Sequence, residues 1–218
     1  MSVSGGLDMI ELSKDNSESS IRDLGFRIAG WFSICMVISL IFLISCWIVA
    51  RIDPSLKSVL LYMIYSPLSL FRWICMVYIL IQFKRLLNER YDFYKADMII
   101  KIQIVVSIIY GVEDILMNNI EALFPLSGFA GGFNDVFSIF YLLVSGIVGI
   151  FMGVSLLAIR EDPYGSLRLY AIISIITSSF LVTILLVPIA SLLFLLQSVI
   201  LGMIFLKAAE AEAQVEFV

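Results

Sequence analysis

The sequence contains no histidine, and charged residues make up only 15% of its 218 residues. Without histidine, the chain lacks the commonest metal ligand and the commonest general base. Its three cysteines, Cys35, Cys46 and Cys75, lie in apolar stretches and form no CxxC pair, which indicates buried small side chains rather than a redox or metal site. No Gly-rich phosphate loop, HExxH or GxSxG motif is present. We therefore expect a protein that is not an enzyme and that uses no cofactor or metal.

Long apolar runs are the main feature of the sequence. Hydrophobic residues make up 61% of the chain, against roughly 45 to 50% in ordinary soluble domains. From Leu169 to Leu206 the chain runs for 38 residues without Asp, Glu, Lys or Arg, with Pro188 at its centre. One helix of that length would measure about 57 Å, nearly twice a hydrocarbon core of about 30 Å. This run therefore predicts two membrane crossings and an all-α, polytopic membrane protein.

Hydropathy predicts six spans in the membrane domain 28–207, with residues 28–50, 58–83, 97–120, 136–159, 169–187 and 189–206. The third span is the weakest, because charged residues interrupt it. We expect residues 1–27 to form a mobile polar tail, with a short amphipathic helix over its last seven residues. Residues 84–95 and 124–134 are predicted to be loops, and residues 208–218 form a C-terminal tail.

Basic residues give a separate test of this layout. With the N-terminus inside, the inner segments carry ten Lys and Arg residues, whereas the outer loops carry only Arg51 and Lys57. This asymmetry is typical of cytoplasmic loops. It predicts a bundle in the cell membrane with both termini in the cytoplasm. The net charge of −4 gives no basic surface for nucleic acid, so the expected partner is the lipid bilayer. A membrane-protein partner or a homo-oligomer remains open.

Polar side chains follow one helical face in each of the second and third spans. The second span carries Tyr62, Ser66, Ser69 and Arg72, and the third carries Gln103, Ser107, Tyr110, Asp114 and Asn118. Such groups are costly against lipid, so the two stripes should face each other or a shared cavity. Because Arg72 lies near mid-depth, it needs a counter-ion, which we expect to be Asp114 or the adjacent Glu113.

Two interpretations of these stripes remain open. In the first, the polar pair fixes the packing of the two helices, and the protein is a non-catalytic scaffold or accessory membrane subunit. In the second, the stripes line a solute or ion pathway in a small transporter or channel-like protein. The first predicts a compact bundle without a continuous cavity, and the second predicts a wet cleft. We expect the first to hold.

The fourth to sixth spans show fewer polar features. Ser145, Gly149 and Gly153 recur every four residues, a spacing that lets two helices approach closely. The hydroxyls of Ser174, Thr177 and Ser178 can bond back to their own helix and so require no cavity. We therefore expect any functional residues to lie between the second and third spans, and we expect the last two spans to pack or to face lipid.

A weak internal similarity relates the two halves. Residues 51–57 and 160–168 both fit Arg-x-Asp-Pro followed by Ser-Leu and a basic residue. A three-helix unit repeated once would have inverted topology, as in many secondary transporters. Since Asp-Pro is also an ordinary helix-ending signal, duplication remains a hypothesis.

Overall fold

The structure is a computed structural model that describes residues 5–52, 64, 66–123, 128–159, 166–183 and 186–215. Within these ranges, the side chains of residues 5–22, 47, 50, 51, 118–123, 128–135 and 212–215 are not described. The fold is all-helical over this part of the chain, as predicted. Its six helices are α1 (Gly5–Ile52), α3 (Ser66–Tyr91), α4 (Asp97–Leu123), α5 (Gly128–Leu157), α6 (Leu167–Val182) and α7 (Val187–Val215).

The six helices form a closed ring. Each helix packs on its neighbours in the chain, in the order α1, α3, α4, α5, α6 and α7, and α7 packs back on α1. Among the described residues, no helix packs extensively on a partner across the ring. Ring closure leaves a central space that side chains from every helix can reach.

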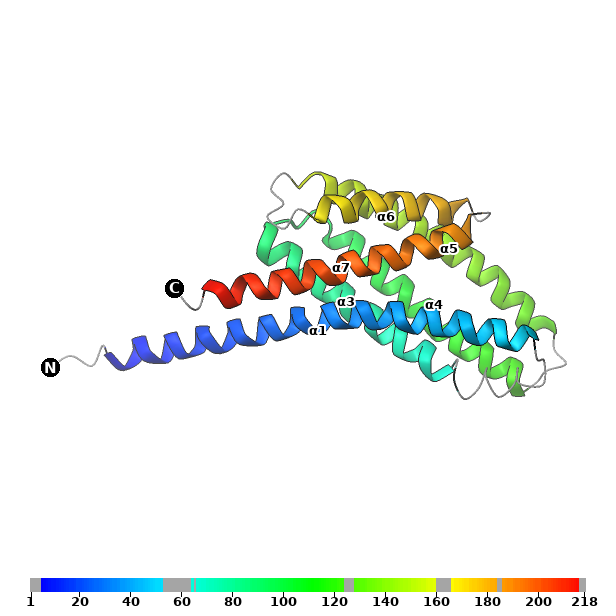
Figure 1. The fold of residues 1–218 in the computed structure, drawn as a ribbon, viewed down its shortest axis with the longest axis horizontal. Helices are drawn as coiled ribbons and strands as arrows, with labels where there is room; N and C mark the ends of the chain where they lie inside the picture. The colour runs from blue at the N-terminus through cyan, green and yellow to red at the C-terminus, as the bar shows by residue number, and fades with distance from the viewer. Residues whose placement is uncertain are drawn as a thin grey trace.

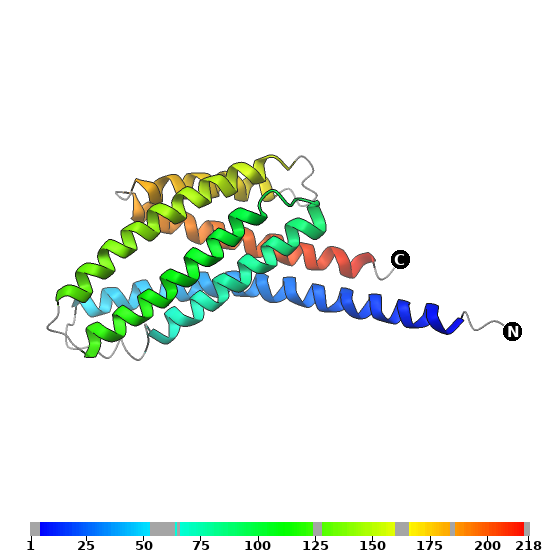
Figure 2. The same cartoon turned by 180° about the vertical axis from the view of Figure 1, so that it is seen from behind.

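Successive helices run in alternating directions, so both termini lie at the same end of the bundle (Figure 1). The helix α1 extends beyond the bundle at that end, alongside the end of α7. Seen from behind, α3, α4 and α5 lie side by side in one oblique layer (Figure 2). The ends of the bundle are therefore distinct, and we call the one that carries the termini the termini end.

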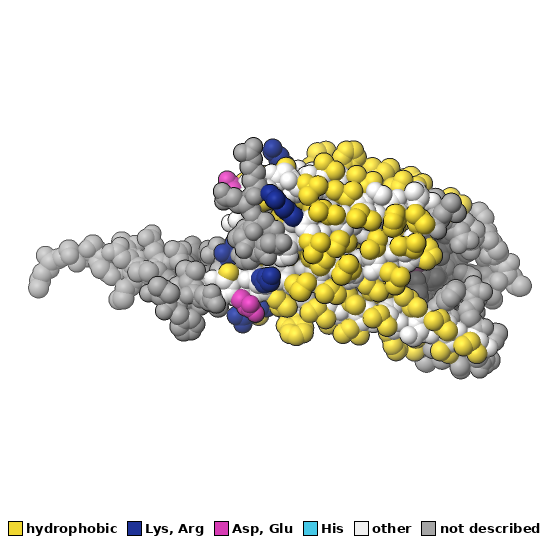
Figure 3. All heavy atoms as spheres, turned by 45° about the horizontal axis from the view of Figure 1, so that its top comes forward, with side chains coloured by type: hydrophobic (Ala, Val, Ile, Leu, Met, Phe, Trp, Pro, Cys, Tyr) yellow, Lys and Arg dark blue, Asp and Glu magenta, His cyan; other side chains and the backbone are white. Residues whose placement is uncertain are grey.

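Four helices are long and apolar enough to cross a membrane: α1 over Asp23–Cys46, α3 over Ser66–Tyr91, α5 over Val136–Leu157 and α7 over Val187–Ala211. The helix α6 is apolar but has only 16 residues. One face of the molecule shows a continuous hydrophobic surface over the middle of the bundle, with basic side chains gathered near the termini end (Figure 3). This distribution is that of a protein whose middle faces lipid.

The helix α4 is polar inside and apolar outside. Its charged residues break the apolar stretch that a spanning helix requires. Yet the residues on its outer face are hydrophobic and at least 40% exposed: Ile102, Val105, Ile109, Val112 and Leu116. Their spacing of three or four residues marks one helical face. Because these apolar residues occupy only the outer face and the polar face turns into the ring, hydropathy averaged along the sequence gives a weak signal for this helix.

Several polar segments that the sequence predicts to be tails or loops are helical. The helix α1 begins at Gly5, so most of the predicted mobile tail is helical. No proline follows Gly6 in this segment, and Glu18 precedes Arg22 by four residues, a spacing that favours a helix. Likewise α5 begins at Gly128, within the predicted loop 124–134, and α7 continues past 206 to Val215.

The predicted loop 84–95 is also mostly helix. The helix α3 continues to Tyr91, and Arg85 donates to Glu89 one turn later at 2.7 Å. The helix ends before Asp92, whose φ of 45° lies in the left-handed region that ends many helices. Lys84 then pairs with Asp97 in the first turn of α4 at 3.1 Å. Strong helix formers therefore shorten this connection to a few residues.

The termini end of the ring is closed by aromatic side chains. Phe26, Phe83 and Phe205 are fully buried, and Tyr170 is 3% exposed. The Phe83 ring centroid lies 5.4 Å from that of Tyr170 and 6.4 Å from that of Phe205, which stacks on Phe26 at 6.2 Å. We call these four residues the phenylalanine cluster. Four helices contribute to it, so it closes the centre of the ring at this end.

Glycines allow two helix pairs to approach closely. A Cβ atom on Gly30 of α1 would lie 2.9 Å from the Leu206 side chain and 3.2 Å from the Gly202 carbonyl of α7. On α5, a Cβ on Gly149 would overlap Ser178, and one on Gly153 would lie 2.9 Å from the Ala171 carbonyl of α6. The two glycines of the small-residue stripe predicted on the fourth span therefore lie against α6 within the same chain.

Candidate solute-binding cavity

The centre of the ring holds a cavity of about 370 Å³. All six helices line it, with polar groups that include Ser33, Arg72, Gln103, Ser145, Ser174 and Gln197. Along α3, the lining runs from Ser69 to Leu80, about 16 Å by helical rise. The phenylalanine cluster lies at one end of this lining and shares Tyr170 with it. The cavity therefore occupies the half of the bundle that lies away from the termini.

The wall between α3 and α4 carries the charged groups. The Ser69 hydroxyl donates to the Asp114 Oδ2 atom at 3.0 Å, and both residues are buried. Arg72 lines the cavity one turn along α3 from Ser69. The two predicted polar stripes thus meet at one wall, where a serine holds the carboxylate. The ion pair of Arg72 with Asp114 stays a prediction.

Three aromatic rings form the next part of the wall. The Tyr110 and Tyr141 rings are stacked, with centroids 3.9 Å apart and planes 13° apart. Trp73 contacts both rings edge-on, at 5.2 and 6.0 Å. The Tyr110 hydroxyl hydrogen-bonds with Ser138 of α5 at 3.2 Å. This group joins α3, α4 and α5 and gives the cavity a rigid aromatic side.

A hydrogen bond from a side-chain amide joins α4 to α5 at another point of the cavity wall. Gln103 is 8% exposed, and its Nε2 atom donates to the Ser145 Oγ atom at 3.3 Å. Ser107, on the same face of α4, is fully buried. Ser145 is thus both the first member of the small-residue stripe and a polar contact at the cavity wall.

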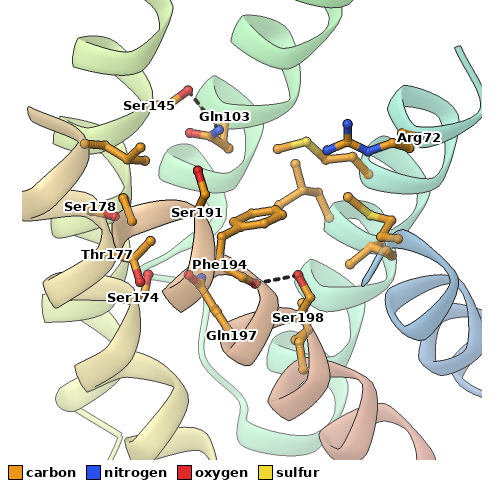
Figure 4. A pocket seen from close by; sticks show the side chains of 18 of the residues that line it. Arg72, Gln103, Ser145, Ser174, Thr177, Ser178, Ser191, Phe194, Gln197 and Ser198 are labelled. Atoms are coloured by element: carbon orange, nitrogen blue, oxygen red, sulfur yellow. Dashed lines mark hydrogen bonds between the residues drawn. The ribbon is translucent and has the colours of Figure 1, made fainter. Parts of the chain in front are cut away.

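The opposite wall carries hydroxyls and a second amide. Ser174, Thr177 and Ser178 lie on the cavity face of α6, and α7 contributes Gln197 with two further serines. Figure 4 shows the three α6 hydroxyls on one side of the pocket and Arg72 on the other, with the Phe194 ring between them. The cavity thus has a charged, aromatic wall and an uncharged, hydroxyl-rich wall.

The other residues of the predicted polar stripes that the structure describes, Ser66, Ser107 and Glu113, do not line the cavity. Ser66 is half-buried at the start of α3, and Glu113 is buried on α4 without lining the cavity. Tyr62 and the side chain of Asn118 lie outside the described residues. The structure brings together Ser69, Arg72, Gln103, Tyr110 and Asp114.

The sequence interpretation missed the contribution of α6 and α7. It placed all chemistry between the second and third spans, whereas six polar residues of these two helices line the cavity: Ser174, Thr177, Ser178, Ser191, Gln197 and Ser198. The signal was present, because the α6 hydroxyls recur at three and four residues and so share one face. The spacing alone does not require a cavity, because a helix hydroxyl can also bond to a carbonyl of its own backbone.

The described residues include no group of three or more His, Cys, Asp or Glu side chains that could hold a metal ion. The described cavity lining provides hydrogen-bonding side chains, one cation, one anion and aromatic rings. No protein-family model, no curated protein and no solved structure matches this chain.

Proposed function

We propose that this protein is a small membrane transporter that binds a polar solute inside its helical ring. The observation that carries the proposal is the cavity, which polar side chains from all six helices line. A bundle whose polar groups served packing alone would bring those groups into direct contact and fill the space between them. Polar cavities at membrane depth are the usual binding sites of transporters. We propose no catalytic role.

We also propose that all six helices cross the cell membrane, with both termini in the cytoplasm. The shared position of the termini supports this orientation, as do the exposed basic residues near that end: Arg27, Lys95, Arg168 and Lys207. The apolar outer face of α4 supports its membrane position. In this orientation the phenylalanine cluster closes the cavity on the cytoplasmic side, and the solute enters from outside.

Orientation is tested by single-cysteine labelling in a background without Cys35, Cys46 and Cys75. Tyr94 is 61% exposed in the short connection between α3 and α4. We expect Tyr94→Cys to react with a membrane-impermeant maleimide only when the cytoplasmic face is accessible. Labelling from the outer face of intact cells would contradict the proposed orientation.

Transport is tested in vesicles that contain the purified protein, with light scattering to follow the entry of small solutes. The panel contains erythritol, xylitol, acetamide, glycine and potassium chloride. We expect at least one solute to enter faster than in protein-free vesicles. Ser191→Trp fills the cavity and should abolish this entry, whereas Leu192→Trp adds the same ring at a residue that is 65% exposed and should not.

Equal entry in protein-containing and protein-free vesicles for every solute would contradict transport. So would equal entry with the two tryptophan variants, provided that both proteins elute as the wild type does in size-exclusion chromatography. Either result would favour the scaffold or accessory-subunit interpretation.

A further inference from the structure

Several serine hydroxyls in the described helices bond back to their own helix. The hydroxyls of Ser33, Ser179, Ser191 and Ser198 each donate to the carbonyl four residues earlier, at 2.8 to 3.0 Å. This contact is the usual way in which a serine is accommodated in a membrane helix. It needs no ligand.

Two cavity hydroxyls differ from this pattern. Ser174 and Thr177 are 1% and 2% exposed, and their hydroxyl oxygens have no hydrogen-bond partner in the described structure. Both residues line the cavity on α6, side by side (Figure 4). Since buried polar groups are nearly always hydrogen-bonded, these two hydroxyls are available to a molecule in the cavity.

A third buried polar atom of the cavity lining also lacks a hydrogen-bond partner in the described structure. Gln103 donates its Nε2 atom to Ser145, but its Oε1 atom is buried without a donor. The site thus offers one atom that only accepts and two hydroxyls that both donate and accept. A partner must present both hydrogen-bond donors and acceptors.

We propose that the cavity binds a small uncharged polyol, whose hydroxyls bond to Ser174, Thr177 and Gln103. This inference rests on the proposed transport function and names its substrate class. A hydroxyl donates and accepts at one atom, so the several hydroxyls of a polyol can bond to groups of either kind.

The charge and size of the cavity agree with such a solute. Among the described residues, its lining carries one cation, Arg72, and one anion, Asp114, so it has no net formal charge. A net-charged solute would gain no compensating charge there. The volume of about 370 Å³ lies at the lower end of the roughly 300 to 1,000 Å³ of small-molecule sites.

The test measures entry of xylitol and erythritol into vesicles that contain the wild type or the double variant Ser174→Ala/Thr177→Val. We expect polyol entry to fall about tenfold in the double variant, as for the loss of two neutral hydrogen bonds. Thr177→Ser keeps a hydroxyl at this position and should retain entry. Ser179→Ala is the matched control on α6, because that hydroxyl bonds to the Ile175 carbonyl, and it should retain entry too.

A second measurement separates a binding role from a structural one. Since Ser174 and Thr177 have no partner in the described structure, the double variant should melt at the same temperature as the wild type or higher. A structural role predicts a lower melting temperature. Xylitol should raise the melting temperature of the wild type but not that of the double variant.

The possible failures are distinguishable. Entry of acetamide or glycine without entry of either polyol would overturn the polyol proposal and leave transport standing. Polyol entry at the wild-type rate in the folded double variant would also overturn it. Entry of no solute at all would remove both the proposed function and this inference.

Discussion

The two halves of the bundle use the same six helices in opposite ways. Toward the termini end, large side chains fill the ring: Phe26, Phe83 and Phe205 are fully buried, and Phe205 contacts both of the others. Toward the other end, side chains of similar helices leave a cavity lined by hydroxyls, amides and one charge of each sign. The same ring is therefore a packed core at one end and surrounds a polar-lined cavity at the other.

This difference shows how a membrane bundle can hold polar groups. Lipid provides no hydrophobic drive between helices, so close packing must stabilise the ring. The phenylalanine cluster at the termini end provides that packing, together with the glycine contacts between α1 and α7 and between α5 and α6. With those contacts in place, the other half can keep an open cavity.

The largest effect should come from breaking the packed half. Phe83→Ala removes a ring that contacts both Tyr170 and Phe205. We expect it to lower the free energy of unfolding by about 3 kcal/mol, through lost contacts and the void that remains. Ile74→Ala on the same helix is the control, because Ile74 is 58% exposed. Denaturant unfolding in detergent micelles measures the stability of both variants. Equal losses of stability would show that the phenylalanine cluster does not contribute more to folding than an exposed side chain.

A graded series at Gly30 should have the next largest effect. Gly30→Ala places a methyl group against the flexible Leu206 side chain, whereas Gly30→Leu must push α7 away. We expect a loss of about 2 kcal/mol for the leucine variant and clearly less for the alanine variant. Thermal unfolding measures the order of stability. Equal stability of the wild type and both variants would show that the close approach of α1 and α7 at Gly30 does not stabilise the bundle.

The contact between Ser69 and Asp114 should show a smaller coupling. A double-mutant cycle with Ser69→Ala and Asp114→Ala should give a coupling energy of about 1 to 2 kcal/mol, since a buried hydroxyl donates to a carboxylate. The control is a cycle on Arg85 and Glu89, which are more exposed and one turn apart. There we expect about 0.3 to 0.5 kcal/mol. Additive losses at Ser69 and Asp114 would show that the wall between α3 and α4 is not coupled.

The sequence predicted the helical class and much of the polar site. The 38-residue uncharged run predicted two helices, which are α6 and α7, and the spacing of polar residues indicated the cavity faces of α3 and α4. Segment ends were less predictable, because polar residues such as Lys84–Tyr91 are also good helix formers. Hydropathy marks where a helix can meet lipid, and it says little about where that helix ends.

By itself the sequence determined that this chain needs lipid as its solvent, because too few polar side chains exist to cover the surface of a soluble fold. It also determined which face of each helix is polar, because that follows from the helical repeat. Only the tertiary structure decided that α6 and α7 share the cavity with α3 and α4. A hydroxyl on a helix can bond to its own backbone or to a neighbour, and ring closure leaves Ser174 and Thr177 facing the open space.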